Sequence, residues 1–399
     1  MADRREIQDL PLWVTMRAHR APASFELELT ARCNNHCRHC YIDLPAGDEC
    51  ARAAELTTDE VLALGREAAD LGALWCLLTG GEPLLRDDFA EVYVGLRRLG
   101  LLVSVFTNAC LVSPAHAELF RRYPPRDLEV TVYGATRETY EAVTRRPGSY
   151  IAFRRGLDLL FEAGLPVRLK AMALRSNLHE FDEIGRFCRG HTADFYRFDP
   201  FLHLRLDGDA TRNAEIRAER LTPEEVVILE GTDEQRIAAL HRGCRDGTLI
   251  WPDTQEACRY GLDHIFHCGA GESSFSVGYD GTFRLCSALC HPDTVFPLRT
   301  HGGEPGTLRV DDGDEPGTLR DGALREAWEQ WVPHVRGLRS AAPEYLEKCR
   351  RCGIVNLCAW CPAHAALETG RLDAWVERFC EVAQARATAL REGDGVGRT

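Results

Sequence analysis

The chain has 399 residues and a formal net charge of −13, enough length for two or three domains with a substantial core. The acidic balance argues against nucleic acid as a partner, because phosphate binding depends on clustered Lys and Arg side chains. The first residues, Met-Ala-Asp-Arg-Arg-Glu, lack the apolar segment of a secretory signal, and no apolar run reaches the length of a membrane span. We therefore expect a cytoplasmic protein without a membrane partner. In a reducing compartment, its 17 cysteines are better explained as metal ligands than as disulfides.

Residues 24–201 alternate strand-like and helix-like segments. Strands are expected near residues 25–29, 74–78, 101–106, 128–133, 167–174 and 194–198. Helix starts are marked by a capping box at Thr57 and by Ser113 followed by Pro114. Three helix-like stretches end at a glycine, as helices commonly do. This alternation predicts an α/β fold built on a parallel sheet.

The first cysteine group follows the first expected strand. It consists of Cys33, Cys37 and Cys40, in the spacing C-x₃-C-x₂-C. Three thiolates on one tight loop can hold three irons of a four-iron cluster and leave the fourth iron open to another ligand. Half of a zinc site, or chance in a cysteine-rich chain, is the alternative explanation.

A second motif follows the next expected strand. It reads Thr79-Gly80-Gly81-Glu82-Pro83. A glycine pair alone usually marks a turn, but here it ends a buried-looking strand, where a backbone without side chains can approach a ligand closely. Both motifs lie just after strand ends, which is where parallel α/β sheets place ligands.

Together, the two motifs resemble the signature of the radical S-adenosylmethionine (radical SAM) enzymes. The resemblance implies a partial (β/α)₆ barrel over residues 24–201, with the SAM amino and carboxylate groups on the open iron. Electron transfer from the cluster would cleave SAM to methionine and a 5′-deoxyadenosyl radical, which abstracts a substrate hydrogen. The motif residues expected to bind SAM are Gly80, Gly81, Glu82 and Pro83.

Further SAM-site candidates come from the same resemblance. His39, before the third cysteine, would lie near adenine, and Asn108 and Tyr133 follow strands whose ends face SAM in the family. Lys170 interrupts an otherwise apolar strand. Because a buried Lys is costly unless it is paired, it is a candidate partner for a carboxylate of SAM or substrate, unless it points outwards. The sequence identifies no general base.

A second cysteine constellation occupies the C-terminal part. By itself, such a cluster suggests a zinc ribbon. In order and spacing, these C-terminal cysteines resemble the SPASM extension of radical SAM enzymes, which holds two auxiliary [4Fe-4S] clusters. Together with the cluster at the first cysteine group, the resemblance implies three clusters. Carried over, the inner cluster would be bound by Cys268, Cys286 and Cys361, and the outer one by Cys349, Cys352, Cys358 and Cys380. Two residues separate Cys358 from Cys361, where the family usually has three, so the placement of Cys361 is the least secure.

The inner cluster would then lack a fourth thiolate. Cys258 is the first candidate for that ligand, followed by Cys244 and Cys290, and an open iron is the alternative. The resulting division is an N-terminal lead (1–23), the radical SAM core (24–201), a helical connection (202–257), the SPASM domain (258–392) and a Gly-rich, disordered tail (393–399).

The resemblance favours a peptide-modifying maturase that oxidises, crosslinks or epimerises a residue of a peptide or protein. Such an enzyme needs an external electron donor such as flavodoxin or ferredoxin. Because the first strand begins near residue 24, a leader peptide would need a separate recognition protein. The alternatives are a small-molecule radical SAM enzyme, of the haem-pathway decarboxylase or alcohol dehydrogenase type, and an iron–sulfur electron carrier without radical chemistry.

Overall fold

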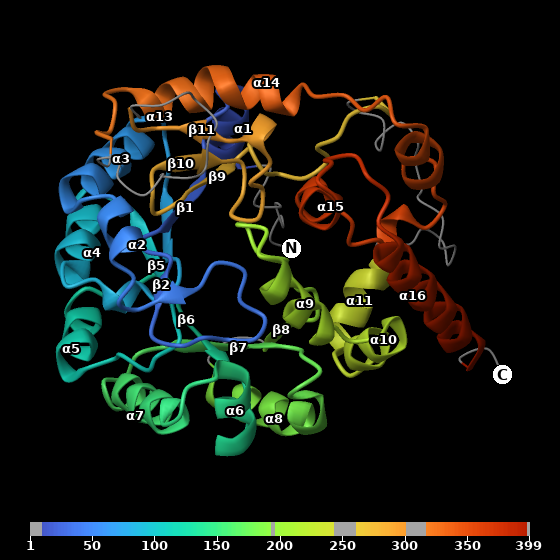
Figure 1. The fold of residues 1–399 in the computed structure, drawn as a ribbon, viewed down its shortest axis with the longest axis horizontal. Helices are drawn as coiled ribbons and strands as arrows, with labels where there is room; N and C mark the ends of the chain where they lie inside the picture. Colours follow the sequence, from blue (N-terminus) through green and yellow to red (C-terminus); the bar gives the residue numbers. More distant parts are fainter. Residues whose placement is uncertain (1–9, 193–195, 243–260, 301–316, 397–399) are drawn as a thin grey trace, which may run out of the picture.

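The computed structural model describes residues 10–192, 196–242, 261–300 and 317–396 (Figure 1). Its centre is a nine-stranded sheet in the order β11-β10-β9-β1-β4-β5-β6-β7-β8. The six strands expected from the sequence form its parallel part: β1 (Ser24–Glu28), β4 (Trp75–Thr79), β5 (Leu102–Thr107), β6 (Leu128–Val132), β7 (Val167–Met172) and β8 (Arg197–Asp199). This confirms the predicted α/β class.

The parallel strands curve into an open arc with helices along its outer side (Figure 1). These helices are α3 (Thr58–Asp70), α4 (Phe89–Arg98), α5 (Pro114–Arg122), α6 (Arg137–Thr144), α7 (Ser149–Glu162) and α8 (Phe181–His191). The caps at Thr57 and Ser113 are present, each as a capping box. The sheet is therefore the partial barrel that the sequence predicted.

The two faces of the parallel strands differ in burial. Leu27, Leu78, Val105, Val130 and Leu169 face the helices and are almost completely buried. The alternate side chains form the inner face, which we call the lumen, and several of them are half-exposed: Glu26, Leu77, Phe106, Lys170 and Met172. Because a packed barrel interior would bury these positions, the lumen is open.

The C-terminal region begins by extending the barrel sheet. β9 (Ser274–Val277) pairs in parallel with β1, and β10 (Thr282–Arg284) and β11 (Phe296–Pro297) follow as antiparallel strands. The region predicted to be a separate domain from residue 258 is thus continuous with the core sheet. A segment of four residues with alternating polar and apolar side chains, Ser274-Phe-Ser-Val277, does not indicate which strand it pairs with.

The remaining helices lie outside this arc. They are α1 (Pro11–Ala18), α2 (Glu49–Ala54), α9 (Ala210–Ala218), α10 (Pro223–Gly231), α11 (Glu234–Arg242), α13 (Ala323–Glu326), α14 (Val332–Arg336), α15 (Pro362–Thr369) and α16 (Glu377–Val396). Helices α9 to α11 agree with the predicted helical connection. The Gly-rich segment from residue 393, expected to be disordered, instead continues α16 as far as Val396.

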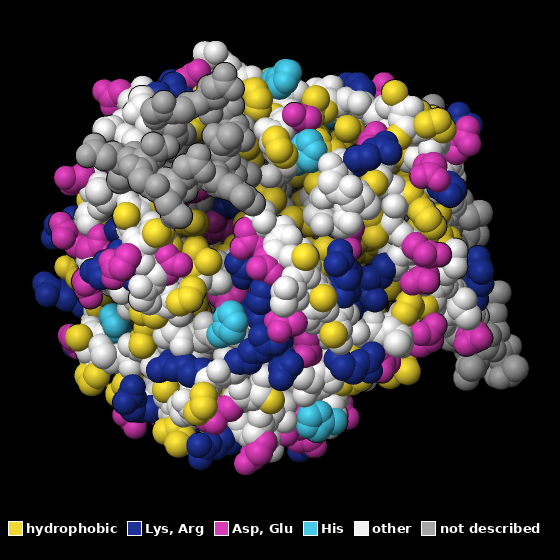
Figure 2. Space-filling model, viewed as in Figure 1, with side chains coloured by type: hydrophobic (Ala, Val, Ile, Leu, Met, Phe, Trp, Pro, Cys, Tyr) yellow, Lys and Arg dark blue, Asp and Glu magenta, His cyan; other side chains and the backbone are white. Residues whose placement is uncertain are grey.

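Charged side chains of both signs are interspersed on the face seen in Figure 2. The ion pairs Arg212–Glu215 and Arg217–Glu368 illustrate this mixing. Within the described part of the chain, no helix combines the length and apolar character needed to cross a membrane.

Candidate functional site

The loop with the first three cysteines leaves the sheet at β2 (Arg32–Cys33), which pairs with β3 (Leu44–Pro45). Cys37 is buried, Cys33 and Cys40 are half-buried, and all three are free thiols. The backbone of the loop is attached to the end of α6, since His36 N donates to Thr144 O at 2.9 Å and Arg38 N donates to Val143 O at 3.0 Å. The structure therefore gathers the three thiols on a loop anchored at both sides.

The buried carboxylate of Asp43 stabilises this loop through hydrogen bonds. Asp43 accepts hydrogen bonds from Arg205 (3.0 Å) and Arg212 (3.2 Å) and lies 2.7 Å from His36 Nδ1. Arg212 also donates to the Cys37 carbonyl oxygen at 2.8 Å. Sequence analysis missed Asp43, Arg205 and Arg212, because nothing in their local spacing connects two arginines with a loop far earlier in the chain.

The two glycines of the second motif lie against the segment that leads into the cysteine loop. Gly80 has φ +130°, and a Cβ there would lie 2.2 Å from Thr30 O. A Cβ on Gly81 would lie 2.3 Å from Arg32 O. Gly81 N donates to Thr30 O at 2.7 Å, and Glu82 N donates to Arg32 O at 2.9 Å. The glycines thus allow a close approach of two backbones, which joins the two motifs.

Replacing Gly81 by valine should therefore reduce both iron binding and SAM binding. The new side chain would displace the backbone at Arg32, next to Cys33, and overpacking of this kind costs about 1–3 kcal/mol or more. Iron content after anaerobic reconstitution and SAM affinity by equilibrium dialysis measure the effect. Gly47→Val is the matched control, since a Cβ on Gly47 meets nothing within 4 Å. Equal iron content in both variants would contradict the prediction.

Glu82 is fully buried at the end of β4. Its carboxylate accepts hydrogen bonds from Thr107 Oγ1 (2.7 Å), Asn108 N (2.8 Å) and Leu84 N (3.2 Å). Burial raises the pKa of Glu82 to about 7, against the lowering effect of these bonds. Pro83 begins the short 3₁₀ helix η2 (Pro83–Leu85) that follows.

Asn108 connects β5 to the cysteine loop. Its Nδ2 donates to Asn34 Oδ1 at 2.8 Å and lies 3.7 Å from Cys33 Sγ. His39 and Tyr133 also meet at this end of the sheet, with ring centroids 5.3 Å apart. Burial lowers the pKa of His39 to about 4, so its ring is neutral at pH 7. The predicted SAM candidates His39, Asn108 and Tyr133 thus lie together beside the cysteines.

Lys170 points into the lumen and does not point outwards. Its Nζ lies 3.2 Å from Glu129 Oε2 and 3.4 Å from the centroid of the Phe106 ring. Glu129 also pairs with Arg197 at 2.8 Å. The carboxylate that Lys170 meets in the structure is therefore that of Glu129, a partner that sequence analysis did not identify.

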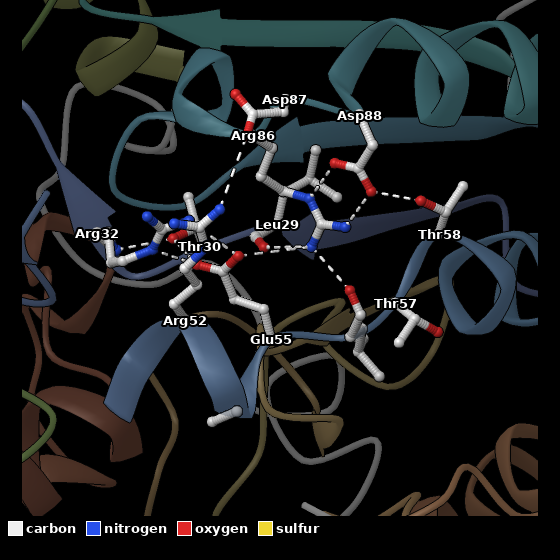
Figure 3. A network of polar contacts seen from close by, with 12 residues as sticks. Leu29, Thr30, Arg32, Arg52, Glu55, Thr57, Thr58, Arg86, Asp87 and Asp88 are labelled. Atoms are coloured by element: carbon white, nitrogen blue, oxygen red, sulfur yellow. Dashed lines mark hydrogen bonds and ion pairs between the residues drawn. The ribbon is translucent and has the colours of Figure 1, made fainter. Parts of the chain in front are cut away.

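A buried ion network connects the two motifs on the outer side of the strand ends (Figure 3). Glu55, at the end of α2, accepts from Arg32 Nε (2.7 Å) and from Thr30, and lies 3.8 Å from Arg86 Nη1. Arg86 follows η2, pairs with Asp88 and donates to Leu56 O at 2.7 Å. The side chains of Arg32, Glu55 and Arg86 are at most 8% exposed.

Glu55→Ala should destabilise the protein by about 3–5 kcal/mol, because it leaves the Arg32 and Arg86 guanidinium groups buried without this carboxylate. The midpoint of thermal unfolding of the reconstituted protein is the measurement. Glu162→Ala, at an exposed position at the end of α7, should change stability by less than about 0.5 kcal/mol. Similar midpoints for the two variants would show that the network does not stabilise the strand ends.

A cavity of about 670 Å³ lies among the C-terminal cysteines, although Cys286 and Cys290 do not line it. Its lining includes six thiols, those of Cys268, Cys349, Cys352, Cys358, Cys361 and Cys380. Two groups of neighbouring cysteines can be distinguished, because the thiols within each group affect one another's pKa. Burial is the main cause that raises the pKa of Cys286 to about 12, and the neighbouring Cys361 and Cys268 contribute to this increase. Burial likewise raises the pKa of Cys349 to about 12, with added effects from Cys380, Cys358 and Cys352. Cys361 and Cys268 are thus electrostatic neighbours of Cys286, and the assignment of these cysteines to an inner and an outer cluster stays a prediction.

Of the three candidates for the fourth ligand of the inner cluster, the structure describes only Cys290. Cys290 lies beside Arg284 and Glu28, which affect its pKa, and its Sγ lies 3.7 Å from Leu206 O. It is therefore a residue of the lumen side. Cys258 and Cys244 lie outside the described residues.

The residue types at the first loop suit an iron–sulfur cluster with SAM. Three free thiols lie on one loop, although no group of three or more Cys, His, Asp or Glu side chains among the described residues is already arranged to hold a metal ion. Asn34 Nδ2 and His39 Nδ1 are buried without a hydrogen-bond partner in the described structure. Unpaired buried donors and acceptors of this kind are expected where a polar ligand binds. Thiolates are soft ligands of the kind that bind iron–sulfur clusters, and six of them line the C-terminal cavity.

An open parallel α/β barrel with a three-thiol loop above its strand ends defines a class of radical enzymes. In agreement, residues 27–188 match the model of the Radical SAM superfamily. The barrel of this chain is therefore similar to the Radical SAM superfamily, and this similarity implies SAM and one [4Fe-4S] cluster as cofactors.

Solved structures with similar folds include Streptococcus suis SuiB bound to S-adenosylmethionine (TM-score 0.61, 15% identity, 92% of this chain and 80% of SuiB). Another is anSMEcpe with bound AdoMet (TM-score 0.58, 14% identity, 95% of this chain and 96% of that one). Among curated proteins, the AdoMet-dependent heme synthase of Methanosarcina barkeri is 27% identical over 359 residues, which covers 88% of this chain and 94% of the relative. The similarity thus spans both the barrel and the C-terminal region.

Proposed function

We propose that this protein cleaves SAM reductively and uses the resulting radical to abstract a hydrogen from a residue of a peptide or protein. The proposal is carried by the placement of the three-thiol loop next to the Gly80–Pro83 segment and Asn108, at the ends of the strands and beside an open lumen. A cluster bound by Cys33, Cys37 and Cys40 supplies the electron and an open coordination position for SAM. The protein then holds the loop through Asp43, joins it to the glycine segment and leaves the lumen free for substrate.

The charges of the lumen favour a peptide over a polycarboxylate substrate. The lumen cations of the described strands are already in ion pairs: Lys170 and Arg197 with Glu129, Arg168 with Asp127, and Arg284 with Glu28. A substrate that carries several carboxylates would have to compete with these acids. The structure of SuiB bound to the precursor peptide SuiA, 15% identical to this chain, provides a precedent for peptide binding on this fold.

A second candidate is a small-molecule reaction of the heme synthase type. It is favoured by the 27% identity to the Methanosarcina barkeri enzyme, which extends over most of both chains. The two candidates differ in substrate and not in the chemistry that produces the radical.

For the C-terminal region, roughly residues 258–392, we propose two auxiliary [4Fe-4S] clusters. Cys268, Cys286 and Cys361 would hold the inner cluster, with Cys258 as the first candidate for its fourth ligand. Cys349, Cys352, Cys358 and Cys380 would hold the outer one. Bound there, such clusters supply a way out for the electron that an oxidation or crosslink leaves on the substrate. The proposal includes a flavodoxin- or ferredoxin-like donor and, for a leader-bearing peptide, a separate recognition protein.

Anaerobic reconstitution followed by a substrate screen tests the proposal. The protein should bind about twelve irons and, with SAM and dithionite, release 5′-deoxyadenosine and methionine. Peptides and haem precursors are then offered in parallel, and products are identified by mass spectrometry. Modified peptide supports the first candidate, and a modified haem precursor replaces it with the second. Bound zinc with little iron, or intact SAM, would overturn the radical chemistry and leave a zinc protein or an electron carrier.

A further inference from the structure

Glu26 is an unusual carboxylate of the lumen. It lies on β1, in register with Ser276 of β9, and it is half-exposed to the open lumen. On the described strands, Glu28 pairs with Arg284, Glu129 pairs with Lys170 and Arg197, and Asp199 accepts from Phe201 N at 2.8 Å. Glu26 forms no ion pair with any described residue, and its hydrogen-bond neighbour is Ser287.

Two further oxygen atoms on the same wall lack partners. Glu28 is 4% exposed and Ser276 is fully buried, yet Glu28 Oε1 and Ser276 Oγ have no hydrogen-bond partner in the described structure. Arg284 pairs with Glu28 and, like Lys170, acts on Glu26 without pairing with it, so that Glu26 is the carboxylate of this wall without an ion pair among the described residues. Arg284 Nε is also buried here without a hydrogen-bond partner in the described structure. We call Glu26, Glu28 and Ser276 the acidic wall.

An acidic wall of this kind is matched by a ligand that brings both positive charge and N–H donors. Burial raises the pKa of Glu26, while Ser287, Arg284 and Lys170 act in the opposite direction. Burying a carboxylate without a cationic partner is unfavourable. The charge of Lys170 acts on Glu26 only from a distance, because the ammonium group of Lys170 is paired with Glu129. A cation from the substrate would supply the missing partner.

We propose that the acidic wall binds an ammonium or guanidinium group of the substrate, such as the side chain of a Lys or Arg residue in a peptide. The inference rests on the peptide substrate proposed above and deepens it. Glu26 accepts the charge-assisted hydrogen bonds, and the buried Glu28 Oε1 and Ser276 Oγ supply further acceptor atoms once the arriving N–H groups displace the surface of the wall. Guanidinium and ammonium groups carry enough donors for these three acceptors.

The test measures binding and needs no turnover. Anaerobically reconstituted full-length protein with bound SAM is titrated with three capped tripeptides, acetyl-Gly-X-Gly-amide with X as Lys, Arg or norleucine, and Kd is read by NMR line broadening. Lys and Arg peptides should bind at least about tenfold more tightly than the norleucine peptide, as expected for a hydrogen bond between charged groups. Glu26→Gln should remove this preference. Asp199→Asn, which removes one negative charge from an exposed position at the end of β8, should keep it.

Three results would overturn the proposal. The first is a wild-type protein that binds the three peptides equally, a comparison that needs no variant and stands even if Glu26→Gln does not load iron. The second is a Glu26→Gln protein with normal iron content and an unchanged preference. The third is an equal loss of preference in Asp199→Asn, which would show that only the total charge of the lumen matters. Failure to cleave SAM would instead overturn the proposed function and leave the binding result intact.

Discussion

Cys37→Ala is expected to abolish SAM cleavage. Cys37 is the buried thiol of the three and the one whose carbonyl oxygen Arg212 holds, so its loss leaves two half-buried thiols to bind a cluster. Two thiolates do not retain a four-iron cluster with an open site, and the rate should fall by at least about 1,000-fold. Release of 5′-deoxyadenosine, measured by chromatography after reduction with dithionite, reports the loss.

Cys188→Ala is the matched control for this experiment. Cys188 is a fully buried thiol on α8, and it belongs to neither cysteine group. The Cys188→Ala protein should retain SAM cleavage, although loss of the buried thiol lowers its stability. If the Cys37→Ala protein still produced 5′-deoxyadenosine at a rate near that of Cys188→Ala, the first loop would not be the site of SAM cleavage.

Cys352→Ala should separate SAM cleavage from product formation. Cys352 lines the C-terminal cavity together with Cys349, Cys358 and Cys380, and none of these residues belongs to the first loop. Release of 5′-deoxyadenosine should stay within about threefold of wild type, while product should fall by about 100-fold or more as an auxiliary cluster loses a ligand. The ratio of product to 5′-deoxyadenosine, measured on the substrate that the screen identifies, is the decisive quantity.

The control here is Cys50→Ala, which removes an exposed thiol from α2. It should keep the wild-type ratio and the wild-type iron content. Normal product formation by Cys352→Ala, with iron lost from the C-terminal region, would show that this region is only structural. Loss of SAM cleavage in the same variant would instead mean that the C-terminal cysteines support the fold of the barrel.

The local features of this protein were predictable from the sequence. The strands β1 and β4 to β8, the caps at Thr57 and Ser113, and the cysteine and glycine motifs all appear where the sequence placed them. Each depends on residues within a few positions of one another, so that periodicity, capping and spacing carry the information. The assignment of the C-terminal cysteines to two clusters, by contrast, stays a prediction.

Contacts between distant parts of the chain were decided only by the tertiary structure. Asp43 meets Arg205 and Arg212, and Lys170 meets Glu129, because the path of the chain brings separate elements together. Pairing of β9 with β1 likewise depends on which strand edge remains free after the barrel forms. Nothing in the local sequence around Glu26 distinguishes it from Glu28, yet the fold gives Glu28 an arginine partner and leaves Glu26 facing the open lumen. An ion pair depends on the distance between two side chains in space, and sequence spacing does not determine that distance for residues on different elements.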